Sequence, residues 1–274
     1  MEVRDGKYDE CNIQNADTVS SPSLKGDDDQ PALVHKGAFN RFQYILENTD
    51  LDTQVQALRE QAIIFGGHSI GGAVATLATL FFLGKGLRNT PPSCITFGSP
   101  LVGDARLGQA IARQDWSGKF CHVVSVAEPL NTIVPHWGPG SDLPIQEASR
   151  TLVNNGLQYT GSPSILYRPS GTYMFCSMNR AACFDDSEAI LKILHCTLQS
   201  NQGLSFDQIV DACISEHTGY GKLLKDITEN LQNSWQIANF VPDSFEMGIA
   251  LALEAIGVGA QKSQRDEKRA RHQH

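Results

Sequence analysis

Apolar residues in the first half of the chain follow helical spacing at first and then gather into short continuous runs. The stretch "GAFNRFQYILENT" places Phe39, Phe42 and Ile45 on one face of a helix, and "VQALREQ" adds a second helical pattern. The run "AIIF" at 62–65 is typical of a strand buried in a parallel sheet. Residues 72–83, rich in small apolar side chains, then predict a buried helix.

Two further apolar runs predict two more buried strands, "SCITF" at 93–97 and "FCHVVSV" at 120–126. The amphipathic stretch "ARLGQAIARQ" between them predicts a helix. Strands and helices therefore alternate at short spacing, which favours right-handed crossovers between parallel strands. The sequence predicts an α/β fold.

The second half of the chain has a less regular pattern. Residues 137–172 contain repeated proline and glycine without a period, which predicts a long surface insertion. The segments "TYMFCS" and "AACF" then predict a small hairpin. Three helical patterns follow at 186–199, at 205–231, where glycines leave open one helix or two, and at 242–257.

Polarity at the two ends of the chain sets the expected domain boundaries. Residues 1–31 are polar and rich in Asp, Ser and Gly, so we expect a disordered N-terminal segment. Residues 261–274 form a charged tail. One domain remains, at 32–260, with 137–172 as its insertion.

Composition narrows the partners, cofactors and location. The formal net charge of −8 argues against nucleic acid as a partner. The seven cysteines are scattered and no pair has zinc-ligand spacing, so we expect reduced thiols and no metal or other cofactor. The N-terminus has no apolar signal segment, and the most apolar stretch, 73–83, is too short to cross a bilayer. These features predict a protein of the cytoplasm and nucleus without a transmembrane segment.

The segment Gly67-His68-Ser69-Ile70-Gly71 fits the pattern G-x-S-x-G between a predicted strand and a predicted helix. In this pattern a serine lies on a tight strand-to-helix turn, and small residues on either side let the backbone double back. The following helix directs its positive end towards the serine, and the N–H of Ile70 can donate to an oxyanion. Ser69 is therefore the candidate nucleophile for attack on an ester, with Ile70 as the oxyanion donor.

The segment "GGHSIGGAVATLATLFFL", followed by "CITFGSPLVGD", resembles a class 3 lipase of the α/β-hydrolase fold. "FCHVVS", "GTYMFCS", "SEHTGYG" and "GIALALEAIG" extend the resemblance over roughly residues 35–260. The similarity is to the plant lipase-like group that includes the enhanced-disease-susceptibility and phytoalexin-deficient immune regulators and the senescence-associated carboxylesterase. The phytoalexin-deficient branch is the most similar. The resemblance implies a role in plant defence or in lipid metabolism.

A nucleophilic serine needs a base, and the base needs a carboxylate to orient it. His217 in "SEHTGYG" matches the His-x-x-Tyr position of the family. It also agrees with the order serine, acid, histidine along α/β-hydrolase chains. His195, within an amphipathic helix, is a weaker candidate, and His122 and His136 are weaker still.

The acid has two candidate positions. Similar lipases carry an Asp just past the strand that "FCHVVS" resembles, usually followed by an apolar pair and proline. Counted from that strand, the position falls on Glu128; counted from "IVP" at 133–135, it falls on Thr132, which cannot hold an imidazolium. We prefer Glu128 because the end of the strand fixes where a side chain points. The resulting prediction is a Ser69–Glu128–His217 triad.

The strand that normally supplies the second oxyanion donor is not evident in the sequence. In this fold the donor follows a strand upstream of the nucleophile, but only "ALVH" at 32–35 is a candidate for such a strand. We therefore expect a domain that lacks its N-terminal strands and a nucleophile strand that lies at the sheet edge. Loss of one oxyanion donor typically lowers the rate by about 10² to 10³.

Two functions fit these observations. The first is a serine carboxylic-ester hydrolase that acts on a lipid or acyl ester. The second, implied by the resemblance, is a lipase-like module of plant immune signalling with a partly degraded hydrolase site. Such a module forms a heterodimer with a family partner of the disease-susceptibility type, through an apolar helix of that partner. The altered acid position and the missing oxyanion strand favour the second function, with hydrolysis as the alternative.

Overall fold

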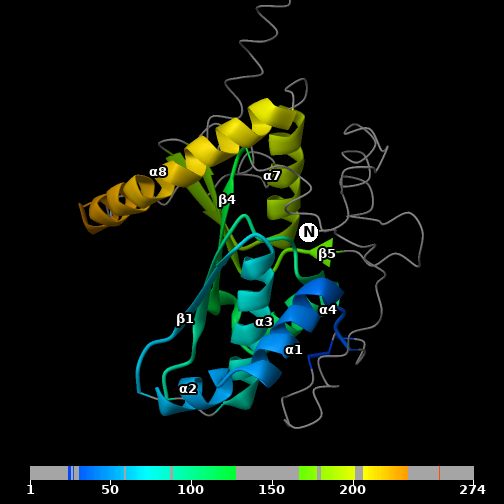
Figure 1. Cartoon of the computed structure of the whole chain (residues 1–274). Coiled ribbons are helices and arrows are strands. Elements are labelled where there is room, and N and C mark those ends of the chain that lie inside the picture. The colour runs from blue at the N-terminus through cyan, green and yellow to red at the C-terminus, as the bar shows by residue number, and fades with distance from the viewer. Residues whose placement is uncertain are drawn as a thin grey trace, which may run out of the picture.

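The computed structural model describes residues 24–25, 27, 31–58, 60–86, 89–127, 167–177, 180–200, 206–233 and 253. Within these ranges a five-stranded sheet forms the centre of the molecule, with helices packed against it (Figure 1). Most of the predicted disordered segment, most of the predicted insertion, the charged tail and all but one residue of the predicted helix at 242–257 lie outside the described residues. No helix in the described ranges is long and apolar enough to cross a membrane.

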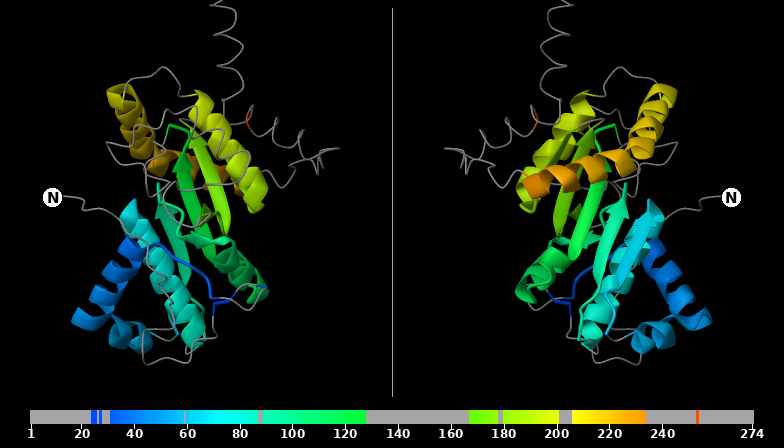
Figure 2. Two further views of the ribbon diagram at one scale, coloured as in Figure 1. Left: turned by 90° about the vertical axis from the view of Figure 1, so that its right-hand side faces the viewer. Right: turned by 90° about the vertical axis from the view of Figure 1, so that its left-hand side faces the viewer.

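The sheet has the strand order β1-β2-β4-β6-β7 (Figure 2). The first four strands are parallel and β7 is antiparallel to β6. The bounds are Ile64–His68 for β1, Ser93–Phe97 for β2, Phe120–Ser125 for β4, Thr172–Ser177 for β6 and Arg180–Phe184 for β7. Helices connect β1 to β2 and β2 to β4, which confirms the predicted α/β fold. The antiparallel pair of β6 and β7 confirms the predicted hairpin.

Six α-helices have described bounds: α1 Lys36–Asn48, α2 Leu51–Ala57, α3 Ile70–Lys85, α4 Ala105–Arg113, α7 Ser187–Ser200 and α8 Phe206–Asn233. A short 3₁₀ turn at Ser117–Lys119 precedes β4. The long α8 is continuous, which decides between the one helix and two helices that the sequence left open. Gly219 and Gly221 both lie within this helix, and a Cβ at either position would meet nothing within 4 Å.

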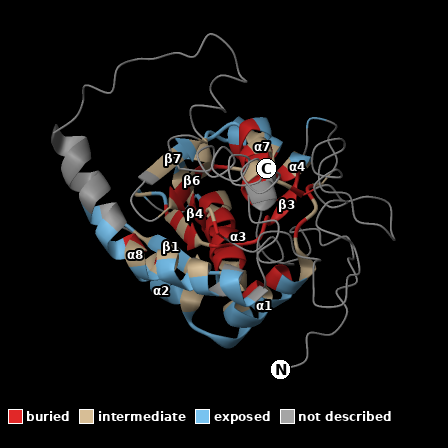
Figure 3. Ribbon diagram, turned by 90° about the horizontal axis from the view of Figure 1, so that it is seen from above, coloured by how far each residue is buried: buried red, intermediate tan, exposed pale blue. Residues whose placement is uncertain are grey.

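Helix α3 is buried along most of its length, between the sheet and α1 (Figure 3). The Phe81 ring meets the Phe42 ring of α1 edge to face, with centroids 5.5 Å apart. The Thr76 and Thr79 hydroxyls donate to backbone carbonyls one turn earlier in the helix, which satisfies these two polar groups in an apolar setting. The small-residue pattern of the sequence therefore reflects a helix that contacts other elements on nearly every side.

The two faces of the sheet differ in how well they are covered. On one face Cys94, Thr96, Val124 and Phe175 are all buried. Their neighbours along the strands point to the opposite face, where Val123 and Cys176 are buried near Tyr220. The other apolar residues of this face are only partly buried: Ile95, Phe97, Cys121 and Met174. Helix α8 contacts β4 and β6 and brings the buried Tyr220 to this second face. Among the described helices, α8 alone covers this second face of the sheet.

A second, two-stranded sheet joins β3, Gly103–Asp104, to β5, Tyr167–Arg168, in antiparallel orientation. The last residues of the predicted surface insertion at 137–172 therefore belong to the folded domain. Tyr167 is only 5% exposed, and β6 begins at Thr172. Sequence composition could not show this, because β5 pairs with residues more than sixty positions earlier. The "ALVH" segment also meets β3, where Val34 bridges Gly103, and is not a strand of the main sheet.

Strand β1 lies at the edge of the sheet in the described part of the chain and pairs there with β2 alone. Its first residue, Ile64, is 61% exposed. This is the edge position expected for the nucleophile strand.

His122 lies in β4 and is fully buried between the rings of Phe120 and Tyr173. Its Nδ1 atom lies 2.8 Å from the hydroxyl oxygen of Thr96, and the backbone of Ser170 makes a second hydrogen bond to the ring. Burial lowers the pKa of His122 to about 4. The imidazole is therefore a neutral part of the core that links β2, β4 and the turn before β6.

Acid should destabilise the fold through His122. The unfolded histidine gains a proton near pH 6.5, whereas the folded one stays neutral down to about pH 4, so stability falls as the pH drops through this window. A His122→Asn variant keeps a polar group near Thr96 but cannot take up the proton. We expect the stability advantage of the wild type over this variant, measured by urea unfolding, to shrink by about 2 kcal/mol between roughly pH 7 and pH 4.5. An advantage that stays constant with pH would contradict this assignment.

Candidate active site

Ser69 joins β1 to α3 and has the backbone geometry of a strained turn. Its φ is 51° and its ψ is −131°, a conformation that costs an ordinary residue free energy. The surrounding backbone holds it there: the Ser69 N–H donates to the carbonyl of Phe97 at 2.9 Å, and its own carbonyl accepts from the Gly72 N–H at 2.8 Å. The sharp turn predicted from G-x-S-x-G is therefore built, at the carboxyl end of β1.

The glycines around Ser69 meet different steric demands. A Cβ on Gly67 would lie 2.2 Å from the carbonyl oxygen of Gly71, and a Cβ on Gly72 would lie 2.7 Å from the Cβ of Ser99. A Cβ on Gly71 would meet nothing within 4 Å. The strand and the helix approach each other most closely at Gly67, so the first glycine of the motif is the one that the turn requires.

Helix α3 begins at Ile70, directly after the serine, and not at Gly72 as the sequence pattern suggested. The first N–H groups of a helix have no partner within the helix and carry its positive end. Ile70 provides the first of these groups, beside the Ser69 side chain. The oxyanion prediction requires an N–H group at this place in the turn.

His217 lies on α8 and reaches the residue that precedes Ser69. Its ring centroid is 5.2 Å from that of His68, in a T-shaped arrangement, and 4.9 Å from that of Tyr220. Tyr220 in turn stacks on Phe97 at the end of β2, with centroids 5.9 Å apart. The structure thus brings the predicted base to the ends of β1 and β2, against His68, the residue before the predicted nucleophile.

Of the other histidine candidates, only His122 has a described side chain. His122 belongs to the buried core, as shown above. His195 lies on α7, where its side chain is not described, and His136 lies outside the described residues. His217 therefore remains the candidate base.

Both candidate acids, Glu128 and Thr132, lie outside the described residues. The carboxylate found at the carboxyl end of β4 comes instead from α8. The Glu216 side chain accepts a hydrogen bond from the Ser125 hydroxyl, and the Ala127 N–H lies 3.4 Å from the same carboxylate oxygen. Sequence analysis missed Glu216, although its place directly before His217 was a signal that it would lie near the site.

No group of three or more His, Cys, Asp or Glu side chains in the described ranges is arranged to hold a metal ion. Five cysteines with described side chains are free thiols: Cys94, Cys121, Cys176, Cys183 and Cys196. Burial raises the pKa of Cys94 and of Cys121, and raises that of Cys176 to about 12, so these three thiols stay protonated near neutral pH.

The unequal roles of the motif glycines can be tested by two matched substitutions. Gly67→Ala should lower the free energy of unfolding by about 3 kcal/mol or more, because the new methyl group collides with backbone. Gly71→Ala should change it by less than about 1 kcal/mol, since the site is open and alanine favours the helix. Chemical denaturation of both variants gives the comparison. Equal destabilisation by the two substitutions would show that the close approach at Gly67 is not the constraint.

Comparisons with known proteins found one matching family and several similar plant proteins. Residues 11–137 match the family described as lipase (class 3). The chain is 28% identical over 253 residues to Protein EDS1B of Arabidopsis thaliana, covering 75% of this chain and 40% of that protein. It is also 28% identical over 248 residues to Lipase-like PAD4 of the same plant, covering 87% of this chain and 37% of that protein. The chain thus spans less than half the length of these relatives.

Among solved structures, the lipase from Rhizopus microsporus var. chinensis is similar, with a TM-score of 0.36 and 23% identity over 53% of this chain and 42% of that chain. The parallel strands with their crossover helices confirm the expected α/β fold, and the match over residues 11–137 agrees with an α/β-hydrolase of the class 3 lipase type. Residues 11–137 thus match the class 3 lipase family, and the chain as a whole is similar to the plant lipase-like proteins EDS1B and PAD4.

Proposed function

We propose that this chain is a lipase-like module of plant defence signalling. It acts in the cytoplasm and nucleus mainly by forming a heterodimer with another lipase-like protein of the disease-susceptibility type. The similarity to EDS1B and PAD4 supports the defence role. The observation that carries the binding role is an open, largely apolar groove beside the candidate nucleophile.

The groove lies between α1 and the first turns of α3 and has a volume of about 420 Å³. Its side chains are mostly apolar and come from both helices. They are Asn40, Arg41, Tyr44, Ile45, Ile70, Gly71 and Val74. Two of them are unusually exposed for their size, Tyr44 at 66% and Ile45 at 37%. Exposed apolar surface of this kind is typical of a site that another molecule covers.

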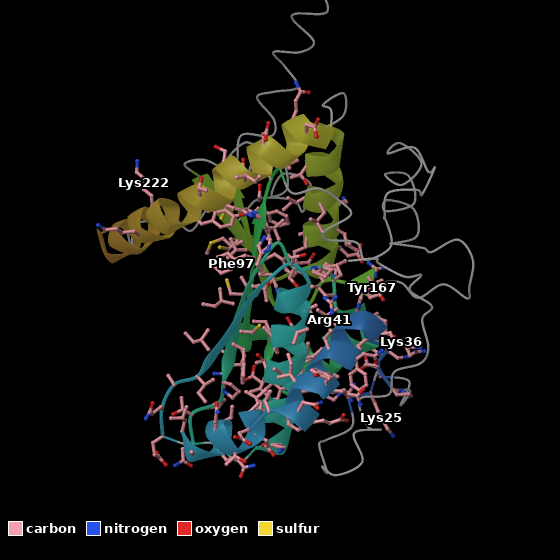
Figure 4. The ribbon with its side chains drawn as sticks, in the orientation of Figure 1. Lys25, Lys36, Arg41, Phe97, Tyr167 and Lys222 are labelled. Carbon is pink, nitrogen blue, oxygen red and sulfur yellow. The ribbon has the colours of Figure 1, made fainter. Side chains whose placement is uncertain are left out.

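An apolar helix of the partner is the occupant that best fits the groove. Two helices form its walls, and an amphipathic helix binds such a groove through side chains on one face. Arg41 lies on α1 beside α3 (Figure 4) and makes no ion pair with the described residues. Its guanidinium can therefore pair with an acidic side chain next to the apolar face of the partner helix.

Binding through the groove can be tested with Ile45→Glu. A carboxylate in the groove would be desolvated by the partner helix, so we expect binding to purified EDS1B of Arabidopsis thaliana, measured by isothermal titration calorimetry, to weaken by about tenfold or more. Ile214→Glu is the matched control, since Ile214 is 56% exposed on α8, outside the groove. That control should bind like the wild type, and so should Ser69→Ala. Failure of the wild type to bind, or equal loss in both glutamate variants, would contradict the proposal.

The alternative function is hydrolysis of a carboxylic ester of a lipid or small acyl compound. In this reaction the Ser69 Oγ attacks the ester carbonyl, His217 takes the serine proton and gives it to the leaving alkoxide, and the Ile70 N–H donates to the oxyanion. Water, giving up a proton to His217, then attacks the acyl-serine, and the acid is released as Ser69 regains its proton. Glu128 remains the predicted carboxylate that orients His217. The positive φ of Ser69 favours this function, because a strained nucleophile turn is a feature of hydrolase sites.

A fluorophosphonate probe tests the alternative directly. We expect labelling of the wild-type chain, none in Ser69→Ala, and a rate about 10² lower in His217→Ala. Thr218→Ala changes an exposed neighbour of His217 and should label at the wild-type rate. Labelling that persists in Ser69→Ala would assign the reactivity to another residue. A folded wild-type chain that does not label would remove hydrolysis from consideration.

A further inference from the structure

A carboxylate from α8 occupies the end of β4, where the acid of a hydrolase triad is expected. The acid normally follows this strand because it must reach the base from there. Here the Glu216 oxygen Oε2 accepts from the Ser125 hydroxyl and lies 3.4 Å from the Ala127 N–H. Both donors belong to the last residue of β4 and the turn directly after it.

Three side chains of α8 contact the ends of three neighbouring strands. Glu216 bonds to the end of β4, Tyr220 stacks on Phe97 of β2, and His217 meets His68 of β1. Positions 216, 217 and 220 fall on one side of a helix, so α8 contacts all three strands with a single face. Figure 4 shows Phe97 beneath this helix.

The Glu216 contact constrains α8 more than the two ring contacts do. Ring–ring contacts tolerate a range of offsets, whereas a carboxylate that accepts two hydrogen bonds needs a defined position. Bonds to a charged acceptor are also roughly twice as strong as neutral ones. Neighbouring side chains on a helix do not face each other, so Glu216 affects His217 through the position of the helix and not by a direct bond.

We propose that Glu216 is a positioning residue of this site. It fixes α8 on the carboxyl end of β4 and thereby holds the His217 imidazole against His68, beside Ser69. The expected effect on the reactivity of Ser69 rests on the hydrolase alternative of the proposed function. The expected contact between the His68 and His217 rings does not depend on that alternative.

Nuclear Overhauser contacts between the ring protons of His68 and His217 give a readout that does not depend on activity. The Gln amide oxygen can accept both hydrogen bonds of Glu216, whereas Ala can accept neither. We expect the contact in the wild type and in Glu216→Gln, and its loss in Glu216→Ala. Asp211→Asn, an exposed carboxylate on the same helix, should retain it. A contact that persists in Glu216→Ala, or that Asp211→Asn also removes, would overturn the proposal.

Labelling by the fluorophosphonate probe gives the second readout. Misplacement of a base by about 1 Å can lower a rate by up to about 10²-fold, so we expect Glu216→Ala to label at least about tenfold more slowly than the wild type. Glu216→Gln should stay within about threefold, because the hydrogen bonds and not the charge fix the helix. Equal loss in both variants would show that the charge itself acts on His217 and would overturn the positioning role.

Two further results have defined meanings. If Glu216→Ala does not fold, Ser125→Ala removes one of the two donors, and we expect it to weaken the His68–His217 contact while the fold persists. Unweakened contact there would contradict the proposal. A wild-type chain that does not label, but shows the expected pattern of ring contacts, would support the positioning role and contradict only the hydrolase alternative.

Discussion

The close approach of β1 and α3 at Gly67 is the constraint on which the rest of the site depends. The Gly67 Cα lies so near the Gly71 carbonyl that no side chain fits between them. This contact forces the chain to reverse within one residue, and Ser69 takes a positive φ as a result. The direction of α3 is set at the same point. Its burial against the sheet and its packing on α1 therefore follow from one contact between backbones.

Much of this arrangement could be predicted from the sequence because it depends on local patterns. The alternation of apolar runs and amphipathic stretches predicted the parallel strands and the crossover helices. The motif G-x-S-x-G predicted the turn at Ser69. The chemistry at the end of β4 could not be predicted in this way, since Ser125 and Glu216 are 91 positions apart. The steric difference between Gly67 and Gly71 was also hidden, because both are equal members of the motif.

One face of the sheet contributes mainly to stability, and the other carries the contacts with α8 near the candidate site. The buried face carries the polar pair Thr96 and His122, whose mutual hydrogen bond lets them lie in an apolar core. The opposite face carries thiols and thioethers and is covered by α8 in the described structure. Stability thus depends mainly on one side of the sheet, whereas the residues that approach Ser69 from α8 lie on the other. A change in the position of α8 can alter the site with little effect on the core.

The edge position of β1 affects how this chain behaves at high concentration. In the described part of the chain β1 pairs on one side only, and Ile64 leaves its edge largely exposed. Another strand recognises such an edge through backbone N–H and C=O groups, whatever the side chains are. Folding of a single chain is independent of concentration, but edge-to-edge association is second order in it. Dilution therefore favours the folded single chain over associated chains. Substitutions of outward side chains on β1 keep its backbone N–H and C=O groups, so they would change this association less than a proline within the strand would.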